Sequence, residues 1–145
     1  MKLSNKGRYA VMAMADLAKM SSNSPINLTE ISLRQGISVS FLEQIFLKLK
    51  RKNLVESSRG PAGGYMLTKL PQEIKLSSII NAVDEKIKII ACKRESKKSC
   101  NGKSVKCITH NLLDDLDKHI NNFFEQNTLR DIIYRENNKQ HKELN

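Results

Sequence analysis

The 145-residue chain contains no tryptophan, and only 5% of its residues are aromatic. Aliphatic side chains and methionine must therefore fill its core, a composition that favours packed helices. The sequence also has no apolar run that approaches the length of roughly 20 residues needed to cross a bilayer. Its amino terminus lacks the apolar stretch of a secretory signal. We therefore expect a cytoplasmic protein without a membrane span.

Acidic residues are few relative to basic ones. Lys and Arg number 25 against 15 Asp and Glu, a formal net charge of +10. Such an excess attracts a polyanion, and nucleic acid is the leading candidate, although a basic composition can also serve solubility alone. Residues 1–75 hold 12 basic and 5 acidic residues, net +7, whereas residues 76–145 hold 13 and 10, net +3. The first half should therefore carry the anion-binding face.

The first half of the chain is typical of three helices. Apolar residues recur at helical spacing from position 10 to position 18. Asn27, three residues before Glu30, is placed to cap a second helix that ends at Gly36, where a left-handed residue costs little. Serines at positions 38 and 40 supply caps for a third helix that runs to about Asn53. Two helices joined by roughly three residues form a helix-turn-helix.

The third helix has two distinct faces. Its buried stripe is predicted to be Leu42, Ile45, Phe46 and Leu49, and its outer face to be Ser40, Glu43, Gln44, Lys48 and Arg51. Glutamine can pair with adenine, glutamate can accept a hydrogen bond from cytosine, and lysine and arginine reach phosphates. We therefore favour a helix that enters a major groove over an ordinary solvated surface helix.

The segment LVESSRGPAGGYMLTK, residues 54–69, contains two short extended runs around a glycine- and proline-rich turn. This pattern predicts a β-hairpin. A phosphate-binding nucleotide loop is the alternative, but such a loop must open a helix, and a strand follows here. A helix-turn-helix followed by a hairpin is a winged helix, in which Arg59 at the hairpin tip could enter a minor groove or bind a phosphate.

The second half of the chain is expected to hold a dimerisation helix. A short fourth helix is expected within residues 76–83, with Ser77 as its cap. Further on, apolar residues spaced three, four and three apart form a short coiled-coil seam: Leu113, Leu116, Ile120 and Phe123. The seam could pack on the amino-terminal core, but we favour pairing with a second copy, since two-fold related recognition helices can read two half-sites. Thr128 is placed to cap a final short helix, and residues 135–145 are expected to be a mobile tail.

All three cysteines lie in one twenty-residue stretch, as Cys92, Cys100 and Cys107, and His110 follows. An odd number of thiols in a cytoplasmic protein argues against a disulfide framework. Three thiols and an imidazole match the ligand number of a tetrahedral metal or an iron pair, while redox-reactive thiols and chance remain open from the spacing alone. A catalytic role for Cys107 with His110 as base has less support than any of these interpretations, because no orienting carboxylate can be identified. We therefore do not expect an enzyme.

Several stretches together resemble the IscR/NsrR-type family of dimeric winged-helix repressors over about residues 1–130: KGRYAVMAM, ISLRQGISVSFLEQIFLKLKRKNLVESSRGPAGGY, INAVDE and the spaced cysteines that end in CITH. The resemblance implies one 2Fe–2S cluster per subunit, held by Cys92, Cys100, Cys107 and His110. It also implies that the DNA-reading residues lie among Ser38, Ser40, Phe41, Glu43 and Gln44, with Arg59 in the wing. Two departures are visible: the gaps between cysteines are seven and six residues instead of five, and Phe41 replaces a tyrosine.

The expected protein is mainly α, with a winged helix-turn-helix, a β-hairpin wing and a long carboxy-terminal dimerisation helix. The winged helix should span residues 1–84, the cluster-binding loop 85–110, and the dimerisation helix with the final helix 111–134. Its expected function is that of a homodimeric repressor that binds a double-stranded DNA operator, senses iron–sulfur cluster status and controls iron–sulfur assembly genes. Two alternatives stay open: sensing of nitric oxide or oxidants by the same fold, and a zinc-stabilised RNA-binding accessory protein.

Overall fold

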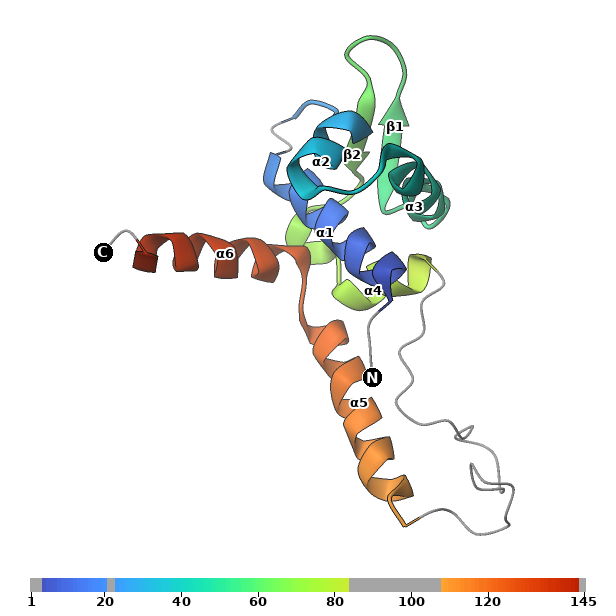
Figure 1. The fold of residues 1–145 in the computed structure, drawn as a ribbon, viewed down its shortest axis with the longest axis vertical. Coiled ribbons are helices and arrows are strands. Elements are labelled where there is room, and N and C mark those ends of the chain that lie inside the picture. Colours follow the sequence, from blue (N-terminus) through green and yellow to red (C-terminus); the bar gives the residue numbers. More distant parts are fainter. Residues whose placement is uncertain (1–3, 21–22, 84–107, 144–145) are drawn as a thin grey trace.

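The computed structural model describes residues 4–20, 23–83 and 108–143. Its elements are α1 (Asn5–Met20), α2 (Leu28–Gln35), α3 (Val39–Arg51), β1 (Val55–Ser58), β2 (Gly64–Leu67), the 3-10 turn η1 (Pro71–Glu73), α4 (Leu76–Ala82), α5 (His110–Gln126) and α6 (Leu129–Glu143). Figure 1 shows α1 to α4 gathered around the base of the β1–β2 hairpin, with α5 and α6 leaving this unit in different directions. The predicted mainly helical winged-helix fold is confirmed. In the described ranges, no helix is long and apolar enough to cross a membrane.

The helix-turn-helix forms where the capping residues predict it. The side chain of Asn27 accepts a hydrogen bond from the Glu30 amide at 2.9 Å, which satisfies one of the free amides at the start of α2. At the other end of α2, Gly36 adopts a left-handed backbone with φ 66° and donates to the Ser32 carbonyl. Ser38 then caps α3 by accepting from the Phe41 amide at 3.3 Å.

An aliphatic core joins α1, α3 and α4. Ala10, Met14 and Leu17 of α1 are fully buried, and the four predicted core residues of α3 are at most 2% exposed. Phe46 is the one aromatic side chain among the fully buried residues that the structure describes. The core is therefore built mainly from aliphatic residues and methionine, as the shortage of aromatics indicates. Burial of each large side chain contributes roughly 1.5–3 kcal/mol.

Both strands of the hairpin contact the core: Val55 of β1 is buried in it, and Tyr65 and Leu67 of β2 pack against it. Strands β1 and β2 are antiparallel, with Val55 opposite Leu67 and Ser58 opposite Gly64. The Tyr65 ring lies 4.8 Å from the Phe46 ring, centroid to centroid, and Tyr65 exchanges backbone hydrogen bonds with Ile26 at 2.8 and 3.0 Å. A side chain at position 64 would collide with the backbone of Ile26. Glycine at this position therefore allows the hairpin to lie directly against the segment before α2.

The corner between α5 and α6 is fixed to the start of α4. The Leu76 amide donates to the Asn127 carbonyl at 2.9 Å, and the Leu129 amide donates to the Ile74 carbonyl at 3.1 Å. The Leu129 side chain is fully buried in the same core as α1 and α3. The winged helix and the corner therefore share one hydrophobic core.

Two helix boundaries differ from the sequence-based expectation. Helix α4 begins at Leu76 with Lys75 as its cap, so Ser77 lies inside the helix. The Ser77 hydroxyl, ahead of Lys75, lowers the pKa of the Glu125 carboxyl in α5. The last helix is not short: it continues to Glu143, through most of the predicted tail. Residues 135–143 contain neither proline nor glycine, and most of them are good helix formers.

Hydrogen bonds between Thr128 and Asp131 stabilise the amino end of α6. The Thr128 amide and hydroxyl both donate to the Asp131 carboxylate, at 2.8 and 3.1 Å. The backbone hydrogen bond from Thr128, followed by that from its hydroxyl, lowers the pKa of the Asp131 carboxyl. The carboxylate also complements the positive end of the helix dipole. Together these contacts explain why α6 begins directly after the corner.

Candidate DNA-binding surface and metal-ligand histidine

The outer face of α3 presents the side chains predicted to read DNA. Ser40, Glu43, Gln44 and Arg51 are exposed, and Lys48 is partly buried. They lie along successive turns of one helix because the opposite face of α3 is held in the core. The hydroxyl of Ser38 is engaged in capping, which leaves its proton available for one further hydrogen bond. The face therefore offers hydroxyl, amide, carboxylate and cationic groups over one helix surface.

The wing is joined to the recognition helix at its base. The Lys50 ammonium donates to the Ser57 hydroxyl at 2.7 Å, and Ser57 belongs to β1. Arg59 follows β1 directly and is exposed. In Figure 1 the loop that contains Arg59 forms the tip of the molecule beyond α3. The hairpin thus carries a cation away from α3 while its base stays in contact with α3.

Phe41 has a structural role that the sequence did not indicate. Its ring is partly buried and meets the ring of Tyr9 in α1 edge to face, with centroids 5.6 Å apart and an interplanar angle of 90°. Such a pair contributes roughly 0.5–1.5 kcal/mol beyond the burial of its surface. Phe41 therefore fixes the first turn of α3 against α1.

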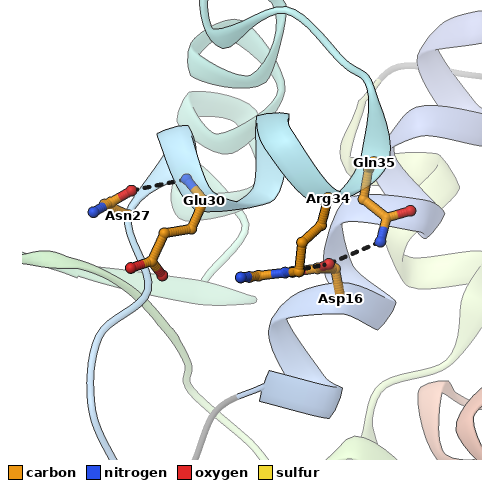
Figure 2. A network of polar contacts seen from close by, with 5 residues as sticks. All are labelled: Asp16, Asn27, Glu30, Arg34 and Gln35. Atoms are coloured by element: carbon orange, nitrogen blue, oxygen red, sulfur yellow. Dashed lines mark hydrogen bonds and ion pairs between the residues drawn. The ribbon is translucent and has the colours of Figure 1, made fainter.

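A buried carboxylate fixes the second helix to the first. Figure 2 shows Asp16 of α1 pointing at Arg34 and Gln35 at the end of α2. The Arg34 Nη2 and Nε donate to the carboxylate at 2.8 and 3.0 Å, and the Gln35 Nε2 donates at 2.8 Å. The hydrogen bond to Asp16 raises the pKa of the Arg34 guanidinium, against the opposing effect of burial. Sequence reasoning missed this clamp, although an aspartate next to Leu17 on an apolar helix face was a visible signal.

His110 is the one proposed metal ligand within the described residues. It is the first residue of α5 and is only 7% exposed. The predicted ligands Cys92, Cys100 and Cys107 lie outside those residues. Over 4–20, 23–83 and 108–143, no three His, Cys, Asp or Glu side chains are grouped so that they could hold a metal ion. The described residues alone therefore do not supply a set of three such ligands around His110.

Helix α5 carries apolar side chains that the chain itself leaves partly uncovered. Of the predicted seam, Leu113, Leu116 and Ile120 are partly exposed and Phe123 is 44% exposed. Leu112, which the periodicity did not include, is 70% exposed. Phe124, by contrast, packs against the main core. Phe124, near the carboxy-terminal end of α5, thus packs on the winged helix, while Leu112 and Phe123 are exposed.

Curated relatives cover nearly the whole chain. The sequence is 45% identical over 133 residues to the HTH-type transcriptional regulator IscR of Serratia proteamaculans, covering 92% of this chain and 79% of the relative. It is 45% identical over 140 residues to IscR of Pectobacterium atrosepticum, covering 97% of this chain and 82% of the relative. These proteins are named as transcriptional regulators and not as enzymes.

Solved structures agree with these relatives. IscR of T. potens matches with a TM-score of 0.74 and 33% identity, over 94% of this chain and 88% of that chain. CymR, described as the global cysteine regulator of B. subtilis, matches with a TM-score of 0.76 and 27% identity, over 91% and 95%. Residues 3–135 match the Rrf2 family profile, described as iron-dependent transcriptional regulator. The chain therefore belongs to the Rrf2 family and is a transcriptional regulator of the IscR type.

Proposed function

We propose that this regulator is a homodimeric, cytoplasmic repressor that holds one 2Fe–2S cluster per subunit and binds a double-stranded DNA operator according to cluster status. The observation that carries the proposal is the position of His110, a buried imidazole that opens α5 directly after the segment containing every cysteine. The iron-dependent description of the family and the identity of nearly half to IscR proteins support it. The regulated genes are proposed to be those of iron–sulfur assembly.

The donor set fits such a cluster. Cys92, Cys100, Cys107 and His110 supply three sulfurs and one imidazole nitrogen, four donors of the kind that a pair of bridged irons requires. The amino end of α5 adds the positive end of a helix dipole near an anionic centre. Cysteine gaps of seven and six residues change the closure entropy of the segment only slightly, because that cost grows with the logarithm of length. When bound, the cluster would supply a redox-sensitive link between the cysteine segment and α5.

Within the described residues, the length of α5 connects His110 to the winged helix. His110 opens α5, and α5 packs against α4. At the opposite end of α5, Lys75 and Glu125 form an ion pair at 3.1 Å, and the corner that follows is hydrogen-bonded to the start of α4. A change in the position of His110 would therefore act on a helix that is packed against the winged helix.

The operator would be read by α3 and the wing. Ser38, Ser40, Glu43 and Gln44 are proposed to face base edges in a major groove, and Phe41 to support the first turn of α3. Lys48, Arg51 and Arg59 are proposed to bind phosphates or, for Arg59, a minor groove. The membership in a family of transcriptional regulators favours this function over the RNA-binding alternative.

Metal analysis of protein purified without oxygen tests the proposal. We expect about two irons and two sulfides per chain, as the 2Fe–2S composition requires, together with visible absorption. A His110→Ala variant should lose most of the iron, whereas the matched variant His119→Ala, on the exposed surface of α5, should keep it. Operator affinity measured with loaded and cluster-free protein then tests sensing.

Stoichiometric zinc without iron or sulfide would contradict the cluster. Equal operator affinity of the loaded and cluster-free forms would contradict sensing of cluster status. Titration of the loaded protein with nitric oxide or with peroxide distinguishes the alternative signals, since the true signal should change operator affinity at the lower concentration.

A further inference from the structure

The amino end of α1 lies beside the first turn of the recognition helix. Tyr9 and Phe41 connect the two helices through their edge-to-face ring contact at 5.6 Å. Both rings are partly buried and pack on the main core, so their relative position is fixed by the fold. Residues next to Tyr9 are therefore held at a defined distance from the residues proposed to read DNA.

Arg8 is exposed at this position, and an aromatic ring supports it. Its guanidinium carbon lies 5.9 Å from the centroid of the Tyr9 ring, within the range of a cation–π contact. The first turn of α1 contains no acidic residue, and none of the ion pairs found among the described residues includes Arg8. The guanidinium is thus partly ordered and keeps its hydrogen-bond donors.

We propose that Arg8 binds a DNA phosphate beside the amino end of the recognition helix, and that the Tyr9–Phe41 pair holds it there. An arginine matches a phosphate because its planar group donates two parallel hydrogen bonds. No ion pair between Arg8 and another described residue has to be broken before the phosphate binds. The aromatic support reduces the number of side-chain conformations that are given up on binding. This assignment rests on the proposed DNA binding and adds α1 to its surface.

The position of Arg8 complements that of Arg59. In Figure 1 the wing loop and the amino end of α1 lie on opposite sides of α3. A phosphate contact on each side of α3 would hold this helix on the DNA from both sides. Contacts to the DNA backbone of this kind fix register and orientation without reading sequence.

The salt dependence of DNA affinity tests the assignment. The affinity of wild-type protein and of Arg8→Ala for one duplex of mixed sequence is measured over a range of salt concentrations. Removal of one phosphate contact should make the slope of log affinity against log salt about one unit shallower. The advantage of the wild type should then fall roughly three- to fourfold between ~50 and ~200 mM salt.

The control variant is Lys142→Ala, which removes the same charge from the exposed far end of α6. It should keep nearly the wild-type slope. Arg8→Lys should also keep the slope, because the charge remains, but with lower affinity. Tyr9→Leu should weaken binding at an unchanged slope, whereas Tyr9→Phe should bind as the wild type, and this last variant carries the test should the leucine variant fold poorly.

An Arg8→Ala protein that behaves like Lys142→Ala overturns the assignment. So does weaker binding with an unchanged slope, which would place the guanidinium away from phosphates, and so does weaker binding by Tyr9→Phe. If the wild-type protein itself binds no duplex, it is the proposed function that fails. The two failures are therefore distinguishable.

Discussion

At the scale of single residues, the hydrogen bonds of Asp16 fix the last turn of α2 to α1. The Asp16 carboxylate receives donors from the last turn of α2, directly before the turn that leads to α3. The sequence predicted the caps of α2 and α3 because each cap depends on two residues that are close together in the chain. It could not predict the clamp, since Asp16 and Arg34 meet only once α1 and α2 are packed. Tyr9 and Phe41 were missed for the same reason.

Replacing Asp16 by asparagine should destabilise the protein by about 1–3 kcal/mol, because a buried amide group would face the donors of Arg34 and Gln35. The control is Glu136→Gln, which breaks the exposed ion pair of Lys19 and Glu136 on the neighbouring surface. That variant should cost at most about 1 kcal/mol. Urea unfolding measures both. Equal losses of stability would show that burial of Asp16 does not matter.

At the scale of the elements, local sequence determined α2, α3 and the hairpin well. Each has a cap or glycine at its boundary and an apolar face of the right period. The length of helix α6 was underestimated because its amphipathic pattern ends at Tyr134. The side chains from 134 to 143 are exposed, so helix propensity is the one remaining signal in that part of the sequence. Burial patterns predict packed helices and say little about solvated ones.

The recognition helix and the wing should respond differently to mutation. Gln44→Ala should reduce the preference for the operator over unrelated DNA by ~1–3 kcal/mol, because the Gln44 amide that would hydrogen-bond a base edge is removed.

Arg59→Ala should weaken binding to both operator and unrelated DNA. If Arg59 contacts a phosphate, the slope of log affinity against log salt should also become about one unit shallower. Competition binding with operator and unrelated duplex measures both effects. An unchanged preference of Gln44→Ala for the operator over unrelated DNA would show that Gln44 does not contact a base.

At the scale of the whole molecule, α5 packs on the winged helix and also carries exposed apolar side chains. Phe124 on one side packs on the winged helix, while Leu112 and Phe123 remain exposed in the single chain. Exposed apolar side chains that recur along a helix are typical of an interface. The sequence indicated this seam from its spacing, but not which side α4 would cover. That choice depends on the corner at Leu129, which fixes how α5 lies.

Ile120→Glu should weaken the proposed homodimer by roughly 2–5 kcal/mol, because a carboxylate would be buried in an apolar seam. Asn122→Glu is the matched control: it introduces the same charge at an exposed polar position of α5 and should leave association unchanged. Sedimentation over a range of protein concentrations measures the effect. A monomeric wild type, or equal behaviour of both variants, would contradict dimerisation through this face.

The buried Leu129 has a practical consequence for the transfer of the winged helix, α1 to α4 with the hairpin, onto another protein. A fragment cut after α4 would leave a leucine-sized hole beneath the helices, and emptying such a hole costs about 2–5 kcal/mol, a large share of the stability of a small domain. The unit that can be transferred intact is therefore discontinuous along the chain. It must include residues 127–132 and a linker that joins α4 to them.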